Sequence, residues 1–240
     1  KRSQQSETYK FPISCPSCGR KSIRVEGEAA WRCIAGLACK DQAIERLKHF
    51  VSRNAFDIDG LGERQIQLFW DGGFISSPAD IFRLRDRRKE LEKKEGLGKR
   101  SVENILNAIE KSRTIKLERL IYGLGIPQIG QATARLLAIN YGTLAILRVA
   151  LMKAADKQAT DYHDLVGIDQ IGESVANDLI NFFADESNLE ILSDIGNELY
   201  IINYEESIIE PTKISGKTIV FTGTLEKMGR AEAKSLAENL

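Results

Sequence analysis

The sequence predicts a mainly α-helical fold, with a small metal-binding module before the helices and a truncated α/β segment after them. Three observations lead to this prediction. Four cysteines lie within 25 residues near the start, four short turns each precede a helical pattern, and a long β-branched run appears only after residue 216. The 240 residues have room for one large domain or two to three small ones, and the composition is ordinary for a globular protein.

The cysteines follow the spacing C-x2-C-x14-C-x5-C. Pro16 lies inside the first pair and Gly19 follows it, a form that directs two thiolates at one metal ion. Four thiolates leave no open coordination position, so we expect one structural Zn²⁺. Two disulfides or redox-active thiols are the alternatives; an intracellular setting disfavours the disulfides, and redox chemistry does not require four cysteines. The expected ligands are Cys15, Cys18, Cys33 and Cys39.

A stack of short helices is expected over residues 41–204. Residues 41–54 have apolar side chains at helical spacing, with Asp41 as the expected N-cap. Helical periodicity then continues almost throughout, and glycines at 72–73, 142 and 196 mark expected helix ends. His49 and His163, the two histidines, are expected on the surface or in the core rather than as metal ligands.

The helices are separated by a recurring turn in which an apolar residue precedes a glycine. The second glycines of the four copies are 36, 32 and 42 residues apart. Such a turn exposes unpaired backbone N–H groups at the positive end of a helix, where a phosphate oxygen binds well. Four copies predict an array that follows a nucleic-acid backbone. The copies are Gly60-Leu61-Gly62, Gly96-Leu97-Gly98, Gln128-Ile129-Gly130 and Gln170-Ile171-Gly172.

The net charge of zero conceals a segregation of charge along the chain. Residues 1–119 carry 25 Lys and Arg against 17 Asp and Glu, whereas residues 120–212 carry 4 against 14. The basic first half is the part expected to attract phosphate. No apolar run approaches the ~20 residues that a membrane-spanning helix needs, so no membrane is expected.

The last part of the chain changes in character. Tyr200, Ile202 and Tyr204 alternate like a strand, and residues 205–211 form an acidic linker. The β-branched run 217–223 predicts another strand, followed by a helix. Because one strand and one helix cannot bury a sheet, we expect a domain that is cut off partway.

Taken in this order, these features resemble the C-terminal half of bacterial NAD⁺-dependent DNA ligases. The cysteine segment is similar to the zinc finger of that family, residues 47–62 to the junction between finger and first hairpin, and 124–134 to the third helix-hairpin-helix motif. The tail from Ile214 resembles the start of a BRCT domain. The implied domains are a remnant of an upstream domain or linker at 1–10, a four-cysteine zinc finger at 11–40, a helix-hairpin-helix domain with four hairpins at 41–204, a linker at 205–213, and an N-terminal BRCT fragment at 214–240.

The resemblance implies a role in sealing nicks in duplex DNA during replication and repair. The family adenylates the lysine of a Lys-x-Asp-Gly motif with NAD⁺, whereas residues 57–60 of this chain have aspartate in the lysine position. NAD⁺ and Mg²⁺ would therefore act only in an absent catalytic domain, and we expect no catalytic residue here and no activity from this chain alone. The expected partners are nicked double-stranded DNA, gripped along the minor groove without sequence preference, and the parent protein's own catalytic and OB-fold domains. A monomer in the bacterial cytoplasm is expected.

The resemblance also places phosphate contacts on the turns, mainly through the backbone N–H groups that follow the glycines. Arg64, Lys99 and Arg100 are expected to add charge-assisted bonds. Acidic residues surround the fourth turn, so a structural role is favoured for Gly172. Alternative functions are a DNA-repair scaffold or accessory segment without a ligase role, and a helix-hairpin-helix glycosylase in which Lys99 imitates the catalytic lysine. The expected DNA-binding residues are Gly60, Gly62, Arg64, Gly96, Gly98, Lys99, Arg100, Gln128, Gly130, Gln131 and Gly172.

Overall fold

The computed structural model describes residues 10–24 and 30–205 and, beyond these, only 217, 219–222, 233 and 237. The chain divides into two compact units, residues 1–204 and 205–240. The helices and strands whose bounds the structure defines lie in the first unit. They are β1 (Ser22–Arg24), β2 (Trp31–Cys33), η1 (Gly36–Ala38), α1 (Lys40–Val51), α2 (Glu63–Asp71), α3 (Pro78–Arg83), η2 (Leu84–Arg87), α4 (Arg88–Leu91), α5 (Lys99–Ser112), β3 (Thr114–Lys116), α6 (Leu117–Gly123), α7 (Gln131–Tyr141), α8 (Leu144–Lys153), α9 (Thr160–Gly167), α10 (Glu173–Ala184), α11 (Glu186–Gly196) and β4 (Tyr200–Ile202).

The cysteine segment forms an antiparallel hairpin of β1 and β2, with Ser22 opposite Cys33, followed by the single turn η1. Helix α1 begins directly after it. The expected N-cap at Asp41 is wrong: Cys39, in extended conformation, precedes the helix, and Asp41 lies in the first turn. There its carboxylate still interacts favourably with the helix dipole. The last cysteine is thus also the residue from which α1 starts.

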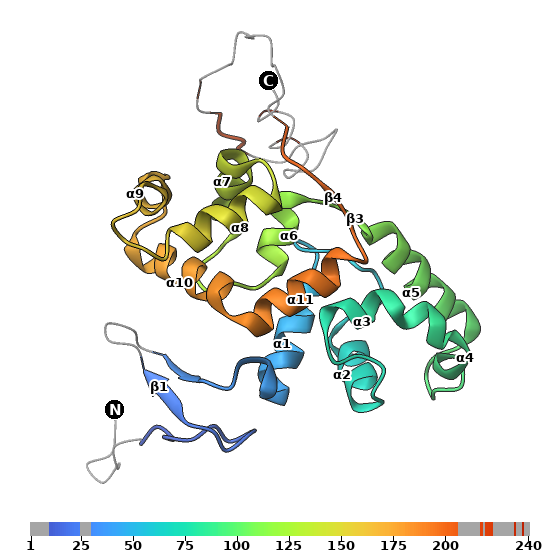
Figure 1. Ribbon diagram of the computed structural model, residues 1–240. Helices are drawn as coiled ribbons and strands as arrows, with labels where there is room; N and C mark the ends of the chain where they lie inside the picture. The colour runs from blue at the N-terminus through green and yellow to red at the C-terminus, as the bar shows by residue number, and fades with distance from the viewer. Residues whose placement is uncertain are drawn as a thin grey trace. The chain divides into compact units, whose positions relative to one another are not determined.

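Each of the four turns connects two helices. The first lies between α1 and α2, the second between α4 and α5, the third between α6 and α7, and the fourth between α9 and α10. In Figure 1, α2 to α5 lie on one side of this unit and α7 to α10 on the other, with α1, α6 and α11 between them. The mainly helical fold that the sequence predicts, with a small cysteine module before the helices, is therefore confirmed.

One continuous hydrophobic core connects the two groups of helices. Phe50 of α1, Phe82 of α3, Leu120 of α6 and Phe183 of α10 all belong to it, and each is at most 1% exposed. Phe50 stacks on Phe56, the ring centroids being 3.9 Å apart. Burying each such side chain stabilises the fold by about 1.5–3 kcal/mol, so the two groups form a common unit.

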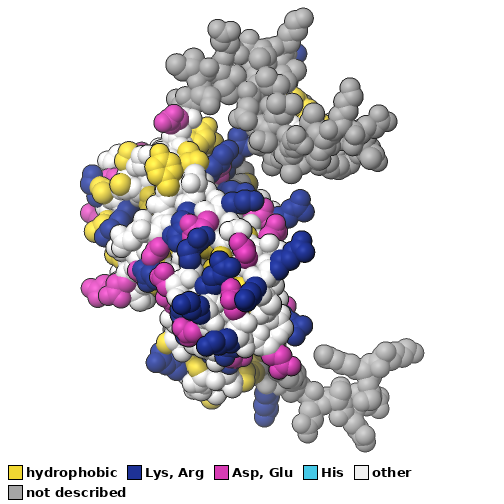
Figure 2. Space-filling view, turned by 90° about the vertical axis from the view of Figure 1, so that its right-hand side faces the viewer, with side chains coloured by type: hydrophobic (Ala, Val, Ile, Leu, Met, Phe, Trp, Pro, Cys, Tyr) yellow, Lys and Arg dark blue, Asp and Glu magenta, His cyan; other side chains and the backbone are white. Residues whose placement is uncertain are grey.

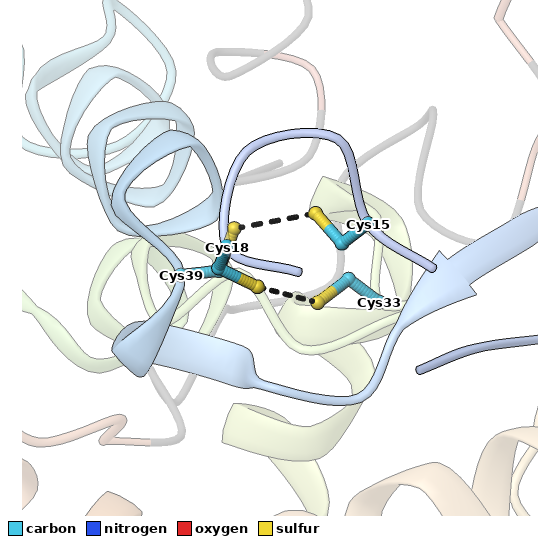
Figure 3. A group of neighbouring side chains, drawn as sticks. All are labelled: Cys15, Cys18, Cys33 and Cys39. Carbon is cyan, nitrogen blue, oxygen red and sulfur yellow. Dashed lines mark hydrogen bonds between the residues drawn. The ribbon is translucent and has the colours of Figure 1, made fainter. Parts of the chain in front are cut away.

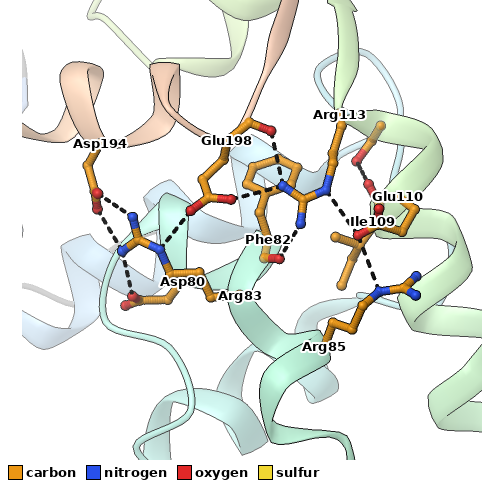
Figure 4. A network of polar contacts seen from close by, with 10 residues as sticks. Asp80, Phe82, Arg83, Arg85, Ile109, Glu110, Arg113, Asp194 and Glu198 are labelled. Atoms are coloured by element: carbon orange, nitrogen blue, oxygen red, sulfur yellow. Dashed lines mark hydrogen bonds and ion pairs between the residues drawn. The ribbon is translucent and has the colours of Figure 1, made fainter.

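Two short strands connect the segment after α5 with the segment after α11. β4 pairs in parallel with β3, with Ile201 opposite Ile115. The alternation at 200–204 predicts β4, but β3 is three residues long and has no pattern of its own. Beside this pair, Arg113 donates to the Phe82 carbonyl and to the Glu198 carboxylate at 2.6 and 2.9 Å (Figure 4).

The expected BRCT fragment falls mostly outside the described residues; of those that are described, 217 and 219–222 are in no strand, and 233 and 237 are helical. No single helix in the described part of the chain is both long and apolar enough to cross a membrane; α7 and α8 meet that test only as a pair bent by 92°.

Candidate metal centre and nucleic-acid interface

The structure brings the four cysteines together (Figure 3). Their sulfur atoms all lie within 4.8 Å of one another, and none is in a disulfide. The Sγ atoms of Cys15 and Cys39 are 3.8 Å apart, and those of Cys18 and Cys33 are 3.4 Å apart. Zinc–thiolate bonds of about 2.3 Å in a tetrahedron place the sulfurs about 3.8 Å apart, so the cluster fits one Zn²⁺.

The surroundings of the cysteines also favour a cation. The backbone N–H groups of Cys18 and Ser17 donate toward the Cys15 sulfur and lower its pKa to about 7. The Arg20 N–H favours the Cys18 thiolate too, but burial and the neighbouring sulfurs outweigh it and raise the Cys18 pKa to about 12. Crowded thiolates repel one another, and a divalent cation bound between them removes this repulsion. The donor set therefore suits structural zinc.

The four turns share one backbone conformation. The first residue of each has a positive φ: 85° at Gly60, 80° at Gly96, 62° at Gln128 and 65° at Gln170. The apolar residue that follows is at most 6% exposed in every copy and donates its N–H to the carbonyl three residues earlier, at 3.0–3.2 Å. A type II turn requires this φ at its third residue. The two copies that lack the first glycine therefore keep the same turn.

The second glycine of each turn begins a helix without a side-chain cap. The first intrahelical bond to each glycine carbonyl comes from the fourth residue after it, for example from the Ile66 N–H to the Gly62 carbonyl at 3.0 Å. The three N–H groups in between have no acceptor within the helix. The four N-caps are Gly62, Gly98, Gly130 and Gly172.

The predicted basic residues surround the first two turns. Lys99 and Arg100 are the first two residues of α5, both exposed, and neither has an ion-pair partner among the described residues. Arg64 is exposed on α2, and its Nη2 lies 4.0 Å from where a Cβ of Gly96 would be. The guanidinium of Arg64, on the helix that follows the first turn, thus lies beside the second turn.

A side chain of the third turn connects it to α10, the helix that follows the fourth turn. The Gln128 amide donates to the Ser174 hydroxyl at 2.9 Å and to the Asp178 carboxylate at 2.7 Å, both on α10. Gln131 and Gly130 are exposed, and Glu173 stands at the start of α10. The amide nitrogen of Gln128 is therefore engaged within the protein, although the residue is exposed.

One further basic residue, Lys48, lies beside the start of α2 and could not be predicted from the sequence. Lys48 of α1 places its Nζ 2.6 Å from Glu63, the first residue of α2. The two residues are 15 positions apart in different helices, so no helical spacing indicates the pair.

On the face shown in Figure 2, basic side chains do not form an unbroken patch. On the face in Figure 2, Lys and Arg are interspersed with Asp and Glu. Residues 53–111 carry 12 Lys and Arg against 11 Asp and Glu, and residues 119–192 carry 5 against 9. A phosphate ligand would therefore have to be attracted by individual cationic groups beside the turns, such as Lys99 and Arg100, rather than by a continuous basic surface.

Three family models match the chain. Residues 14–40 match the C4 zinc finger domain of NAD-dependent DNA ligases, 53–111 match a SAM-like helix-hairpin-helix tandem, and 119–192 match a helix-hairpin-helix motif. The last two matches contain the first and second turns, and the third and fourth turns, respectively.

Curated relatives match the whole chain. A DNA ligase of Rhodopseudomonas palustris is 48% identical over 100% of the chain, and DNA ligases of Gluconobacter oxydans and Pelobacter propionicus are 49% and 43% identical over 98% and 99%. The chain spans 34–36% of the length of these relatives. The chain therefore corresponds to about a third of an NAD-dependent DNA ligase, and the matches to that family's zinc finger and to helix-hairpin-helix motifs lie within residues 14–192.

Proposed function

We propose that this chain is the non-catalytic, DNA-gripping portion of a ligase that seals nicks in duplex DNA. The single observation that supports it best is the repetition of one turn geometry four times, each copy with uncapped helical N–H groups after a glycine. Backbone N–H groups at helix starts bind phosphate oxygens whatever the base sequence, so the grip is independent of sequence. The zinc centre has a structural role and takes no part in chemistry.

The first and second turns form the principal contact. Arg64, Lys99 and Arg100 surround them with cationic groups, whereas Asp169, Glu173 and Asp178 surround the fourth turn with carboxylates. We propose phosphate contacts at Gly60, Gly62, Gly96 and Gly98, a backbone contact at Gly130 with Gln131, and a packing role for Gly172. The chain acts as a monomer in the bacterial cytoplasm, beside the catalytic and OB-fold domains of the parent protein.

A charge reversal at the second turn tests this proposal. Lys99→Glu with Arg100→Glu should weaken binding of a fluorescent nicked duplex at least about tenfold at low salt, because two phosphate contacts are replaced by repulsion. Lys153→Glu, on α8 and outside the four turns, is the control and should change affinity less than about twofold. Equal affinities of the double variant and the wild-type chain would refute the proposal.

A further inference from the structure

Helix α1 begins at the metal centre, and its far end lies beside the start of α2, the helix that follows the first turn. It starts after Cys39 and carries Lys48 near its other end. The Lys48 ammonium lies 2.6 Å from a carboxylate oxygen of Glu63 and 2.7 Å from one of Glu45. Glu63 directly follows Gly62, at the N-terminus of α2 where the proposed function places a phosphate.

A carboxylate at this place opposes phosphate binding. It interacts well with the helix dipole, but a phosphate that approaches the same N–H groups meets a like charge within a few ångströms. The equivalent residues of the other turns are Lys99, Gln131 and Glu173. The first and fourth turns thus carry the same unfavourable residue.

These two turns differ in whether a cation accompanies the glutamate. Residues 61–70 and 171–180 have the same sequence of buried, intermediate and exposed positions, so Glu63 and Glu173 occupy similar surroundings. Glu63 is paired with Lys48, whereas Glu173 has no ion pair with any residue that the structure describes. The cation comes from α1, the helix that precedes the first turn.

We propose that Lys48 completes the phosphate site of the first turn by neutralising Glu63, so that the first turn binds DNA and the fourth does not. The inference rests on the proposed function. The Lys48 side chain is 20% exposed and held between two carboxylates, whereas the Glu63 side chain is 79% exposed. Hydrogen bonds to Glu45 and Glu63 raise the pKa of Lys48, and the bond from Lys48 lowers that of Glu63, so both groups are charged at neutral pH.

A second ion pair provides the matched control. Lys40 of α1 and Asp71 of α2 are 2.8 Å apart and connect the same two helices. Asp71 is the last residue of α2, at the opposite end from Gly62. If these pairs only hold α1 against α2, Lys40 and Lys48 should be equally important for DNA binding.

The experiment compares four variants of the zinc-loaded 240-residue chain by fluorescence anisotropy with a nicked duplex. Lys48→Met, which keeps the aliphatic stem, should weaken binding about three- to tenfold, and Lys40→Met less than twofold. Glu63→Gln should strengthen binding about two- to fivefold, and the variant with both Lys48→Met and Glu63→Gln should bind like Glu63→Gln alone, because residue 63 then carries no charge for Lys48 to neutralise. Urea unfolding midpoints that agree between Lys48→Met and Lys40→Met would exclude a folding defect as the cause.

Two results would overturn the inference. In one, Lys48→Met binds like Lys40→Met; in the other, the combined variant is as weak as Lys48→Met, so that Lys48 does not act through Glu63. The Lys99→Glu and Arg100→Glu variant separates this failure from that of the proposed function. If that variant is weakened while Lys48→Met is not, only the inference about Lys48 is wrong; if neither is weakened, the proposed function is wrong as well.

Discussion

Positive φ at the first position of each turn determines which residues are tolerated there. Gly60 meets the requirement without strain, and a Cβ added to it would lie 2.8 Å from Cγ1 of Ile105. Gln128 and Gln170 adopt the same φ at a cost of about 1–2 kcal/mol each. The buried apolar residue and the following glycine suffice to predict these turns from sequence, but the partners of the Gln128 amide on α10 could not be predicted, because they lie 46 and 50 residues away.

A pair of alanine substitutions separates the structural glycines from the ligand-facing ones. Gly60→Ala should lower the free energy of unfolding by about 2 kcal/mol or more, through φ strain and the contact with Ile105. Gly98→Ala, with an ordinary φ of −80° and nothing within 4 Å, should lower it by no more than about 1 kcal/mol. Its methyl group stands where a phosphate would approach, so DNA affinity should fall several-fold. Urea titration and anisotropy measure the two effects; equal stability losses would contradict the assignment.

At the scale of elements, ion pairs connect segments that the sequence separates widely. Arg83 of α3 bonds to Asp194 of α11 and, at 2.8 Å, to Glu198, which also pairs with Arg113 (Figure 4). These partners are 85 to 115 residues apart, so neither helical periodicity nor local spacing indicates them. The helices could be predicted because each has an apolar face, whereas their mutual arrangement depends on such distant contacts.

Removing Arg113 should be costly. Its guanidinium bonds to Glu110, to the Phe82 carbonyl and to Glu198, with the side chain 28% exposed. Arg113→Ala should lower the free energy of unfolding by about 2–3 kcal/mol, because Glu198 loses a partner and a buried carbonyl loses its donor. Arg113→Lys should recover part of this loss. A urea midpoint for Arg113→Ala equal to that of the wild-type chain would contradict the role assigned to the network.

Glu198 should make stability depend on pH. Burial raises its pKa, but hydrogen bonds and charges from Arg113 and Arg83 outweigh burial and lower the pKa below the ordinary 4.5. Because the folded pKa is lower than the unfolded one, its contribution is complete above about pH 5 and is lost as pH falls through the folded pKa. The free energy of unfolding, measured from pH 6 to pH 3, should fall less steeply for Glu198→Gln than for the wild-type chain. Parallel curves would contradict this account.

The acidic residues of the fourth turn should limit DNA binding at that element. Asp169 and Glu173 flank its exposed N–H groups. Replacing both, with Asp169→Asn and Glu173→Gln, should strengthen binding of a nicked duplex about two- to tenfold. The fall of log K with log salt should also become steeper, by the slope that corresponds to about one additional phosphate contact. Asp161→Asn with Glu190→Gln, on α9 and α11, removes the same charge elsewhere. An equal gain in that control would indicate a general charge effect.

At the scale of the whole molecule, the zinc centre and the helical core have separate sources of stability. The cysteine segment depends on its metal, since structural zinc in comparable peptides contributes about 10–16 kcal/mol. The helices share a continuous apolar core that extends from Ile44 to Ile195. The cysteine spacing predicts the metal centre in full because four ligands of one kind lie close in sequence. The position of Lys48, on α1, beside Glu63 could not be predicted, because it depends on how α1 and α2 pack together.

Metal removal should therefore unfold one part and spare the other. A strong chelator should release one Zn²⁺ per chain, and the far-UV circular dichroism of the helices should change by less than about a tenth, because α1 is the only helix that starts at a ligand among those described. Atomic absorption and circular dichroism measure the two quantities. Complete loss of helical signal on chelation would contradict the independence of the helical core.

The central claim is that this chain holds duplex DNA through its phosphates at the turns. Its most direct test is the affinity for two nicked duplexes of unrelated sequence, measured by fluorescence anisotropy over a salt series. We expect equal affinities for the two duplexes and a linear fall of log K with log salt, with a slope of about −0.9 for each phosphate held. An affinity that does not change with salt, a marked preference for one sequence, or no binding at low salt would contradict it.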